Sequence, residues 1–384
     1  MGASAAQMRG GALAAAMAEA DPSSLGAAQR LRARFGPELS AWALTQASLR
    51  RRGRVKFERA DEMLFTPDGV EQATRDAVRR WRADRFRAAG TTIVWDLGCG
   101  IGADAMAFAE AGLSVHAVDP DPTAAEVASH NLALVGAGPA EVGLAEQADV
   151  PLGHAVFLDP ARRTARGRTW NVADFTPPWQ LVLDHLASDR FVSVKLGPGL
   201  PKELIPDGVH ATWVSDGGDV VEVSLWNRLP AGTSAVLLRD GAELRLEAPE
   251  AGPTELAVAP VGRYLYEPDG AVIRAGLVTE VGVGADRWLL DRHVAYLSSD
   301  APLETPFATG FEVVDVLDYS LKTLRAYVRE HAIGTLEIKK RAIDVDPAAL
   351  RRQLKPSGSS SATLIIARTP AGTKAIVGRR FWHG

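Results

Sequence analysis

The sequence has a single cysteine and no long apolar stretch, and both features narrow the class of protein. Cys99 stands alone among 384 residues, so no intrachain disulfide can form and nothing indicates an oxidising compartment. The Ala-rich N-terminus lacks a basic segment before a long apolar run and continues into Glu19 and Asp21, which argues against a signal peptide. No apolar run approaches the length that spans a membrane. We therefore expect a cytoplasmic protein without a membrane anchor.

Charge is unevenly distributed along the chain. The total is −4, which by itself disfavours nucleic acid as a partner. Residues 1–90 carry +6 and residues 321–384 carry +9, whereas residues 91–225 and 226–320 carry −11 and −8. Two basic ends around an acidic middle indicate that the ends contact an anionic partner.

Composition and periodicity predict a globular protein of two or three domains. Hydrophobic residues make up 46% and charged residues 23%, which excludes a disordered or collagen-like chain. Residues 22–89 place apolar residues at helical spacing. From Thr91 the pattern becomes strand, glycine loop, helix and strand, which is typical of a βαβ unit in a parallel sheet. After Asn227 the chain reads as strands, with a hairpin turn at Asp240-Gly241. Helices return near Tyr319.

The predicted fold is therefore α/β, with a helical region before the parallel sheet and a β-rich or α+β region after it. We expect an amphipathic helix after Tyr319 that ends near Gly334, then a strand, a short helix and two final strands. The sequence divides into four segments: 1–89 (helical cap), 90–226 (parallel sheet), 227–319 (β-rich) and 320–384 (small α/β unit).

The most informative motif is a glycine-rich loop that follows the first strand of the βαβ unit. Gly98, Gly100 and Gly102 let the backbone turn tightly and approach a ligand where a Cβ atom would collide. Asp96 precedes the loop. Asp119 ends the next predicted strand, where a carboxylate can accept hydrogen bonds from both hydroxyls of a ribose.

Two kinds of cofactor fit this outline. A dinucleotide would place its pyrophosphate on the loop, where Asp96 and Asp104 would face the phosphates. S-adenosylmethionine carries an ammonium and a sulfonium group and no phosphate, so carboxylates suit it better. We read Cys99 as a small residue that fills a tight loop and not as a nucleophile.

The segment DLGCGIGADAMAFAEAGLSVHAVDPD (96–121) closely resembles the first two motifs of class I S-adenosylmethionine-dependent methyltransferases. This resemblance implies a Rossmann-like fold, S-adenosylmethionine as cofactor and no metal. It also implies that Asp149 lies near the adenine amino group, although a solvated loop acid is an equal alternative.

Asp159 and Pro160 follow the next predicted strand, at the sheet edge where open α/β folds bind ligands. Methyltransferases that act on nitrogens often carry Asp-Pro-Pro and an aromatic residue here. This sequence has Ala161 and Arg162 instead, so the stacking partner would come from Trp170, Phe175 or Trp179. Several arginines follow within a few positions, among them Arg162 and Arg163, and they suggest a phosphate-bearing substrate or a solvated loop.

A second set of residues suggests a different reaction. Lys195 ends a predicted strand and Glu222 lies within another. With Asp159 they resemble part of the Lys-Asp-Lys-Glu set of ribose 2′-O-methyltransferases, in which a lysine deprotonates a hydroxyl. Lys56 is a candidate for the fourth member. An ion pair without a catalytic role is the alternative.

Three features flank the sheet. Arg50–Lys56 is the densest basic run and either tracks a phosphate backbone or ends a solvated helix. Residues 66–82 precede the first strand, where related RNA methyltransferases have a helical element that closes over the cofactor. Phe65 and Thr66 would then line the cofactor site, and Phe65 is equally well a core residue. Lys339, Lys340 and Arg341 lie in the basic C-terminal unit.

The C-terminal segments 264–278 and 321–354 resemble the THUMP-like region that accompanies a group of bacterial methyltransferases. THUMP domains occur with enzymes that modify tRNA, so this resemblance implies RNA, either tRNA or rRNA, as the partner. We expect a methyltransferase that acts on a nitrogen of an RNA base. The alternatives are a ribose 2′-O-methyltransferase, an RNA-binding protein that keeps the fold without activity, and a small-molecule methyltransferase.

Overall fold

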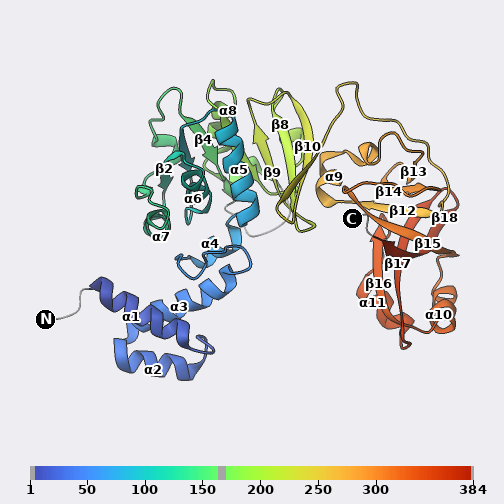
Figure 1. Ribbon diagram of the computed structural model, residues 1–384, viewed down its shortest axis with the longest axis horizontal. Coiled ribbons are helices and arrows are strands. Elements are labelled where there is room, and N and C mark those ends of the chain that lie inside the picture. The colour runs from blue at the N-terminus through green and yellow to red at the C-terminus, as the bar shows by residue number, and fades with distance from the viewer. Residues whose placement is uncertain (1–4, 163–169, 382–384) are drawn as a thin grey trace. The chain divides into compact units, whose positions relative to one another are not determined.

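The computed structural model describes residues 5–162 and 170–381. These residues form two compact units, which Figure 1 shows coloured along the chain. The first unit contains Met1–Leu196, Leu200–Val209 and Ser224–Pro230. The second contains Gly197–Gly199, His210–Val223 and Ala231–Gly384. No helix among the described residues is both long and apolar enough to cross a membrane.

Helices open the first unit, as the spacing of apolar residues predicts. They are α1 (Ala5–Ala18), α2 (Leu25–Phe35), α3 (Pro37–Gly53), α4 (Pro67–Gln72) and α5 (Asp76–Ala88). The Ser24 side chain accepts a hydrogen bond from the Ala27 amide and caps α2, and Pro37 opens α3. Small and apolar residues such as Ala16, Leu31 and Ala43 form a core shared by α1, α2 and α3.

A nine-stranded sheet follows. Its order is β11-β10-β8-β9-β7-β4-β1-β2-β3. The strands are β1 (Ile93–Leu97), β2 (Ser114–Asp119), β3 (Glu141–Val142), β4 (Ala155–Leu158), β7 (Val192–Leu196), β8 (His210–Asp216), β9 (Asp219–Trp226), β10 (Gly232–Arg239) and β11 (Ala242–Glu247). β1 pairs in parallel with both β2 and β4, so the chain reverses its direction of travel across the sheet between these strands. Ligands bind at such a switch point, at the carboxyl ends of the strands.

Helices and short elements connect these strands. They are α6 (Ala103–Glu110), α7 (Pro122–Ala133), η1 (Ala145–Gln147), η2 (Val172–Asp174), α8 (Trp179–Leu186) and η3 (Lys202–Leu204), with a separate two-stranded sheet of β5 (Ala161–Arg162) and β6 (Phe175–Thr176). Phe86 of α5 contacts Phe108 of α6 at 4.8 Å between ring centroids, and Phe108 contacts Phe157 of β4 at 5.6 Å. Aromatic packing therefore fixes α5 and α6 on one face of the sheet.

The second unit contains a seven-stranded sheet with the order β13-β14-β12-β15-β18-β17-β16. Its elements are β12 (Tyr264–Pro268), α9 (Gly270–Ala275), η4 (Val278–Glu280), β13 (Trp288–Asp291), β14 (Val294–Ser299), β15 (Ala308–Asp318), α10 (Leu321–Glu330), β16 (Ile333–Arg341), α11 (Pro347–Leu354), β17 (Ser360–Thr369) and β18 (Gly372–Phe381). Leu324 of α10 and Leu350 of α11 share a core with Leu336 and Ile338 of β16. This sheet takes strands from both sequence segments 227–319 and 320–384, whereas β10 and β11 belong to the nine-stranded sheet.

The predicted hairpin is confirmed, and one predicted helix end is wrong. Asp240 and Gly241 have φ angles of 51° and 78° and join the antiparallel strands β10 and β11. The helix after Tyr319 was expected to end near Gly334, but α10 ends at Glu330. Gly334 lies in β16, where a Cβ atom would come within 1.8 Å of the Gly358 carbonyl oxygen. Close backbone approach, and not a helix cap, explains this glycine.

Candidate functional site: a cavity at the switch point

The glycine loop leaves β1 and returns at α6 through three residues with positive φ. The φ angles of Gly98, Gly100 and Gly102 are 93°, 56° and 77°. The Gly98 amide donates a hydrogen bond of 2.8 Å to the Val118 carbonyl oxygen, which ties the loop to β2. L-residues rarely adopt this conformation, so glycine is favoured at each of the three positions.

Asp119 closes β2 and organises the loop opposite it. Its Oδ2 accepts a hydrogen bond of 2.8 Å from the Gly100 amide, and its Oδ1 accepts one of 2.9 Å from the Asp121 amide. Burial raises the pKa of Asp119, and these two backbone hydrogen bonds oppose the rise. Each oxygen keeps a further lone pair for a ligand hydroxyl.

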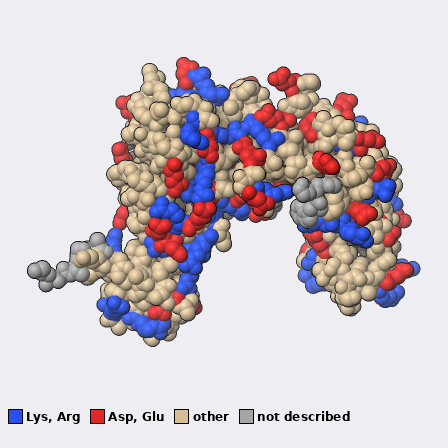
Figure 2. Space-filling model, viewed as in Figure 1, with Lys and Arg blue, Asp and Glu red and all other residues tan. Residues whose placement is uncertain are grey.

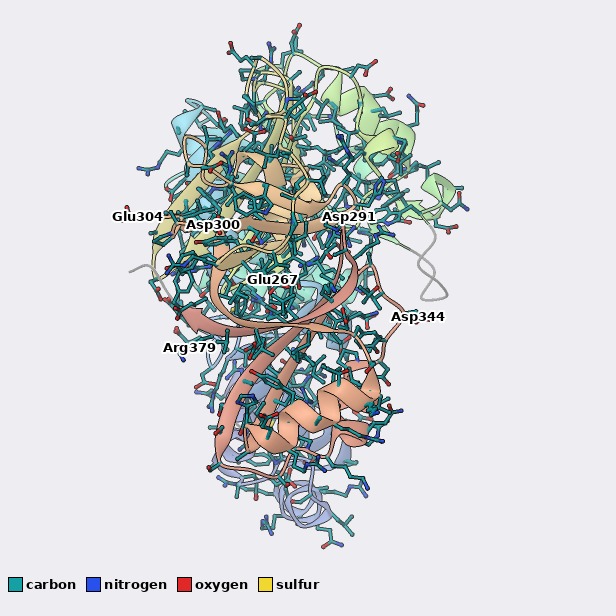
Figure 3. The ribbon with its side chains drawn as sticks, turned by 90° about the vertical axis from the view of Figure 1, so that its right-hand side faces the viewer. Glu267, Asp291, Asp300, Glu304, Asp344 and Arg379 are labelled. Atoms are coloured by element: carbon teal, nitrogen blue, oxygen red, sulfur yellow. The ribbon has the colours of Figure 1, made fainter. Side chains whose placement is uncertain are left out.

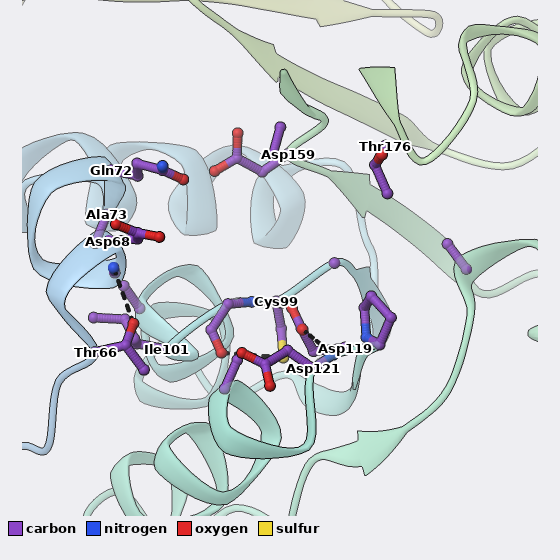
Figure 4. A pocket seen from close by; sticks show the side chains of 18 of the residues that line it. Thr66, Asp68, Gln72, Ala73, Cys99, Ile101, Asp119, Asp121, Asp159 and Thr176 are labelled. Atoms are coloured by element: carbon purple, nitrogen blue, oxygen red, sulfur yellow. Dashed lines mark hydrogen bonds between the residues drawn. The ribbon is translucent and has the colours of Figure 1, made fainter. Parts of the chain in front are cut away.

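A cavity of about 680 Å³ opens between this loop, α4 and the end of β4. Figure 4 shows Asp68 and Gln72 of α4, Asp119 and Asp159 around it. Six acids line it: Asp68, Asp104, Asp119, Asp121, Glu146 and Asp159. Among the described lining residues there is no lysine or arginine. Such a lining fits a cofactor that carries an ammonium and a sulfonium group, and it opposes a pyrophosphate.

Asp96, which the sequence suggested for the cofactor, does not line the cavity. It is 1% exposed on β1, and neither carboxylate oxygen has a hydrogen-bond partner. Burial raises its pKa well above the usual range, and the charges of Asp104, Asp159 and Asp119 raise it further. Burying a carboxylate without a hydrogen-bond partner costs free energy. A cation bound in the neighbouring cavity would reduce that cost, so the position of Asp96 favours a cationic ligand.

The predicted adenine-side acid also lies elsewhere. Asp149 is exposed and is not part of the cavity lining, whereas Glu146 in η1 is. Gly102 is likewise outside the lining, and its role is to bring α6 close to α7: a Cβ atom there would lie 3.2 Å from the Cβ atom of Ala128. The sequence gives no periodic signal in the short segment between β3 and β4, so it could not distinguish Glu146 from Asp149.

Asp159, Pro160 and Lys195 meet where β4 and β7 end side by side. Leu158 pairs with Val194, so the residues that follow are neighbours on adjacent strands. Lys195 forms an ion pair with Asp159, and its Nζ also donates a hydrogen bond of 3.4 Å to the Gln72 carbonyl oxygen. Burial raises the pKa of Asp159 and the charge of Lys195 opposes this. Pro160 is buried, as is Glu222 on β9.

α4 forms the roof of the cavity and is held at both ends. Thr66 caps it and lines the cavity, while Phe65 is a core residue. A Cβ atom on Gly69 would lie 2.2 Å from Cγ2 of Ile101, so only glycine allows α4 to approach the glycine loop this closely. At the other end, Nζ of Lys56 donates hydrogen bonds to the carbonyl oxygens of Glu71 and, at 3.1 Å, Ala73.

Lys56 is therefore close to Lys195. Burial lowers the pKa of Lys56, and the charge of Lys195 lowers it further. Lys56, Lys195 and Asp159 are three of the four residues that the sequence suggested for a ribose-directed reaction.

Side chains of the basic run Arg50–Lys56 bond to other groups of the protein. Arg50 is buried and donates to the Met63 and Glu62 carbonyl oxygens. Arg52 pairs with Glu71 at 2.6 Å, and Arg54 pairs with Asp61 at 2.9 Å. On the face shown in Figure 2, positive and negative side chains are interspersed over the helices of the first unit. The run thus fastens α3 to the segment before α4 and, through Glu71, to α4 itself.

The basic residues of the C-terminal unit are divided between two faces of β16. Lys339 and Arg341 point the same way and pair with Glu267, labelled in Figure 3, at 2.6 and 3.3 Å. Lys340 is exposed and donates to the Ile343 carbonyl oxygen. Glu267, Lys339 and Arg341 line a second cavity of about 1020 Å³ with Arg239 and Arg380. The side chain of Arg162, and Arg163 as a whole, lie outside the described residues.

Aromatic residues form a row beside the first cavity. The ring centroids of Trp170 and Phe175 are 6.0 Å apart, and those of Phe175 and Trp179 are 5.4 Å apart. Thr176 and Pro177, which follow Phe175, line the cavity. Among the described residues, no group of three or more His, Cys, Asp or Glu side chains is placed to hold a metal ion.

Comparisons with known proteins agree with this geometry. A protein of Mycobacterium tuberculosis, described as an uncharacterized S-adenosylmethionine-dependent methyltransferase, is 35% identical over 361 residues, which cover 89% of this chain and 96% of the relative; the proteins of strains CDC 1551 and H37Rv give the same values. A crystal structure of a Porphyromonas gingivalis protein assigned as a methyltransferase has a TM-score of 0.78 over 100% of both chains at 20% identity, so the two share a fold.

Two family models match parts of the chain. A family described as THUMP domain-like matches residues 308–380, which begin at β15, ahead of the predicted boundary at residue 320. A domain of unknown function (DUF8688) matches residues 8–53, the α1–α3 bundle.

Proposed function

Because this chain belongs to the family of S-adenosylmethionine-dependent methyltransferases represented by its Mycobacterium relative, we propose that it transfers a methyl group from that cofactor to a nitrogen of an RNA base, in tRNA or rRNA. The observation that carries the proposal is the position of Asp159. It follows β4 at the switch point and lines the same cavity as Gly98, Gly100 and Asp119. A nucleophile bound to Asp159 would thus lie next to the cofactor.

The residues around Asp159 suit a planar base with an amino group. When bound, S-adenosylmethionine supplies an electrophilic methyl group. Asp159 would accept a hydrogen bond from the amine, and the backbone carbonyl of Pro160 offers a second acceptor. Trp170 and Trp179 lie at the two ends of the aromatic row and would supply a stacking surface. Holding the amine in line with the methyl group accounts for most of the catalysis that we expect.

Support for RNA comes from the second unit. Four cations, Arg239, Lys339, Arg341 and Arg380, line its cavity together with the acids Asp240, Glu267 and Asp269. Glu267 already pairs with two of these cations, Lys339 and Arg341, and neutralises part of their charge. We expect each of the two to bind Glu267 and an RNA phosphate at the same time. The match of residues 308–380 to a THUMP domain-like family supports the same partner by association. Such an RNA would be met in the cytoplasm.

A second candidate is transfer to a ribose 2′-hydroxyl. The clustering of Lys56, Lys195 and Asp159 favours it, since burial and a neighbouring cation lower the pKa of Lys56, so that a larger fraction of it is deprotonated and can accept a proton. Against it, the Nζ atoms of both lysines are engaged with the carbonyl oxygens of residues 71–73, which gives them a structural role.

One experiment tests both candidates. Purified protein is incubated with methyl-labelled S-adenosylmethionine and size-fractionated RNA from a strain that lacks the gene, and the RNA is digested to nucleosides. Label in a base-methylated nucleoside is the expected result. Label in a 2′-O-methylated nucleoside would establish the second candidate instead. Label found only in small molecules would reject RNA as the substrate, and RNA binding without cofactor affinity would indicate a protein that has lost activity.

A further inference from the structure

Two side chains of the roof helix α4 reach into the cofactor cavity without bonding to the protein. Asp68 and Gln72 both line the cavity, and they are four positions apart, so they lie on the same face of the helix. Figure 4 shows both side chains directed from α4 into the space that Asp159 also faces. Both are exposed, and neither side chain forms a hydrogen bond or an ion pair with any residue that the structure describes.

Most of the other acids in the cavity already have a bonding partner. Four of them bond to groups of the protein: Asp104 to Arg82, Asp119 to the Gly100 amide, Asp121 to the Thr123 amide and Asp159 to Lys195. Glu146 resembles Asp68, because it too lacks a partner among the described residues. It lies in η1, which follows β3, and therefore belongs to a different wall of the cavity from α4.

The order of the strands indicates which part of S-adenosylmethionine lies at each wall. The sulfur of the cofactor carries the methyl group, the ribose and an amino-acid chain. We assign the ribose to Asp119, at the end of β2, and the methyl group to the neighbourhood of Asp159, after β4 on the other side of β1. The adenine is attached to the ribose on the side away from the sulfur, so it extends toward η1. The wall that remains for the amino-acid chain is α4.

The two side chains on α4 match the two charged groups of that chain. Its ammonium group donates hydrogen bonds and its carboxylate accepts them. Asp68 supplies a negatively charged acceptor, and the side-chain amide of Gln72 supplies N–H donors. The helix dipole also favours an acid in the first turn, which would account for Asp68 alone but not for Gln72. Gly69 allows this helix to lie against Ile101 of the glycine loop, so both side chains are held at the cavity.

We propose that Asp68 and Gln72 form the subsite for the amino-acid chain of the cofactor. The Asp68 carboxylate accepts a hydrogen bond from the ammonium group, and the Gln72 amide donates one to the carboxylate of the ligand. The inference concerns the cofactor and does not depend on which substrate is methylated, so it can fail while the proposal about RNA stands, and the reverse.

Ligands that lack one charged group at a time test the two contacts separately. Calorimetry at pH 7 and constant salt compares S-adenosylhomocysteine with one analogue that lacks its amino group and one that lacks its carboxylate. In Asp68→Asn the affinity for S-adenosylhomocysteine should fall about tenfold, because a neutral amide replaces the charged acceptor. The affinity for the analogue without the amino group should be unchanged or higher, since a negative charge has been removed near its carboxylate.

The second contact is tested by Gln72→Met, which keeps the length of the side chain and removes its donor. The affinity for S-adenosylhomocysteine should again fall about tenfold, as expected for the loss of a hydrogen bond to a charged group. The affinity for the analogue without the carboxylate should not change. Because both side chains are exposed, neither replacement disturbs the core, and thermal denaturation without ligand confirms this for each variant.

Glu146→Gln is the matched control, because it neutralises the other cavity acid that lacks a partner. It should weaken all three ligands by nearly the same factor, since they share the adenosine. The decisive quantity for Asp68 and Gln72 is the coupling between the side chain and the ligand group, as in a double-mutant cycle. If either variant weakens S-adenosylhomocysteine and its matching analogue equally, or leaves the affinity for S-adenosylhomocysteine at the wild-type value, the proposal is overturned for that residue.

Discussion

Lys195, near the end of β7, is ion-paired with Asp159, which directly follows the neighbouring strand β4. The pair is half-buried, with side-chain exposures of 13% and 33%. Through the Gln72 carbonyl oxygen, Lys195 also contacts the roof helix α4. The residue that we expect to orient the substrate is therefore linked through one ammonium group to a helix that lines the cavity.

Replacing Asp159 should separate cofactor binding from methyl transfer. In Asp159→Asn the cofactor loop and Asp119 are untouched, so the affinity for S-adenosylmethionine should fall much less than methyl transfer does, by the effect of one lost negative charge among the six acids that line the cavity. Methyl transfer should fall by about a hundredfold or more, because a neutral amide replaces the charged acceptor that positions the amine. Calorimetry and labelled-methyl incorporation into RNA measure the two quantities. Unimpaired transfer would remove Asp159 from the site.

Asp119→Ala should abolish measurable cofactor binding. The variant loses the acceptors for the ribose hydroxyls and also the two hydrogen bonds that hold the amides of Gly100 and Asp121. Calorimetry with S-adenosylmethionine is the measurement, and circular dichroism shows whether the fold persists. A folded variant with wild-type affinity would contradict the position that we assign to the cofactor.

Glu146 and Asp149 offer a direct comparison between the structure and the sequence pattern. Glu146 lines the cavity and Asp149 is exposed outside it. Glu146→Gln should therefore weaken binding of S-adenosylmethionine by about 1 kcal/mol, roughly fivefold, because a hydrogen bond to a charged acceptor becomes a weaker one to a neutral amide. Asp149→Asn should leave the affinity unchanged. The opposite ranking would restore the role that the sequence suggested for Asp149.

Residues that follow a strand were predictable, and residues whose function depends on distant partners were not. Asp119 and Asp159 end or follow apolar runs, and parallel strands bring such ends together, so the sequence predicted that both lie at this edge of the sheet, and both line the cavity there. Arg82 is one of several arginines in α5, and only the fold shows that it is fully buried against Asp104.

Long-range pairing also limited the interpretation of the basic segments. Lys339 and Arg341 read as free cations in the sequence, yet Glu267, more than seventy positions earlier, pairs with both. The sequence allowed the run Arg50–Lys56 either to contact a phosphate backbone or to end a solvated helix. In the structure it instead bonds to other groups of the protein, at Glu62, Met63, Glu71 and Ala73. Local pattern finds a cation but not the group that neutralises it.

The glycines of the loop should differ in what they contribute. Gly100→Ala meets no atom within 4 Å and should cost only about 1–2 kcal/mol for its positive φ, but it should weaken cofactor binding because Gly100 lines the cavity. Gly102→Ala adds contacts of 3.2–3.3 Å with Ala128, so its free energy of unfolding should fall further. Thermal denaturation ranks the two variants, and equal stabilities would show that α7 moves away from the loop without cost.

Asp96 should lower the stability of the protein without its cofactor, and the effect should depend on pH. Its pKa is higher in the folded than in the unfolded state because the carboxylate is buried without partners. Between the two pKa values the folded state binds more protons than the unfolded state, so the free energy of unfolding falls as pH rises through this interval and stays low above it. Asp96→Asn removes this dependence.

The variant should therefore match the wild type at about pH 4, near the usual pKa of an aspartate. At pH 7.5 it should be more stable by about 1–3 kcal/mol, the desolvation cost of an unpartnered polar group, which corresponds to a rise in Tm of several degrees for the first unit. The same variant should bind S-adenosylmethionine more weakly, because a negative charge near the cavity is lost. Thermal denaturation at the two pH values and calorimetry provide the measurements, with the exposed Asp149→Asn as the control. A variant that is less stable than the wild type at pH 7.5 would contradict this prediction. It would show that Asp96 makes favourable contacts in the folded protein, and binding of a cationic cofactor would then not be needed to explain why Asp96 is buried there.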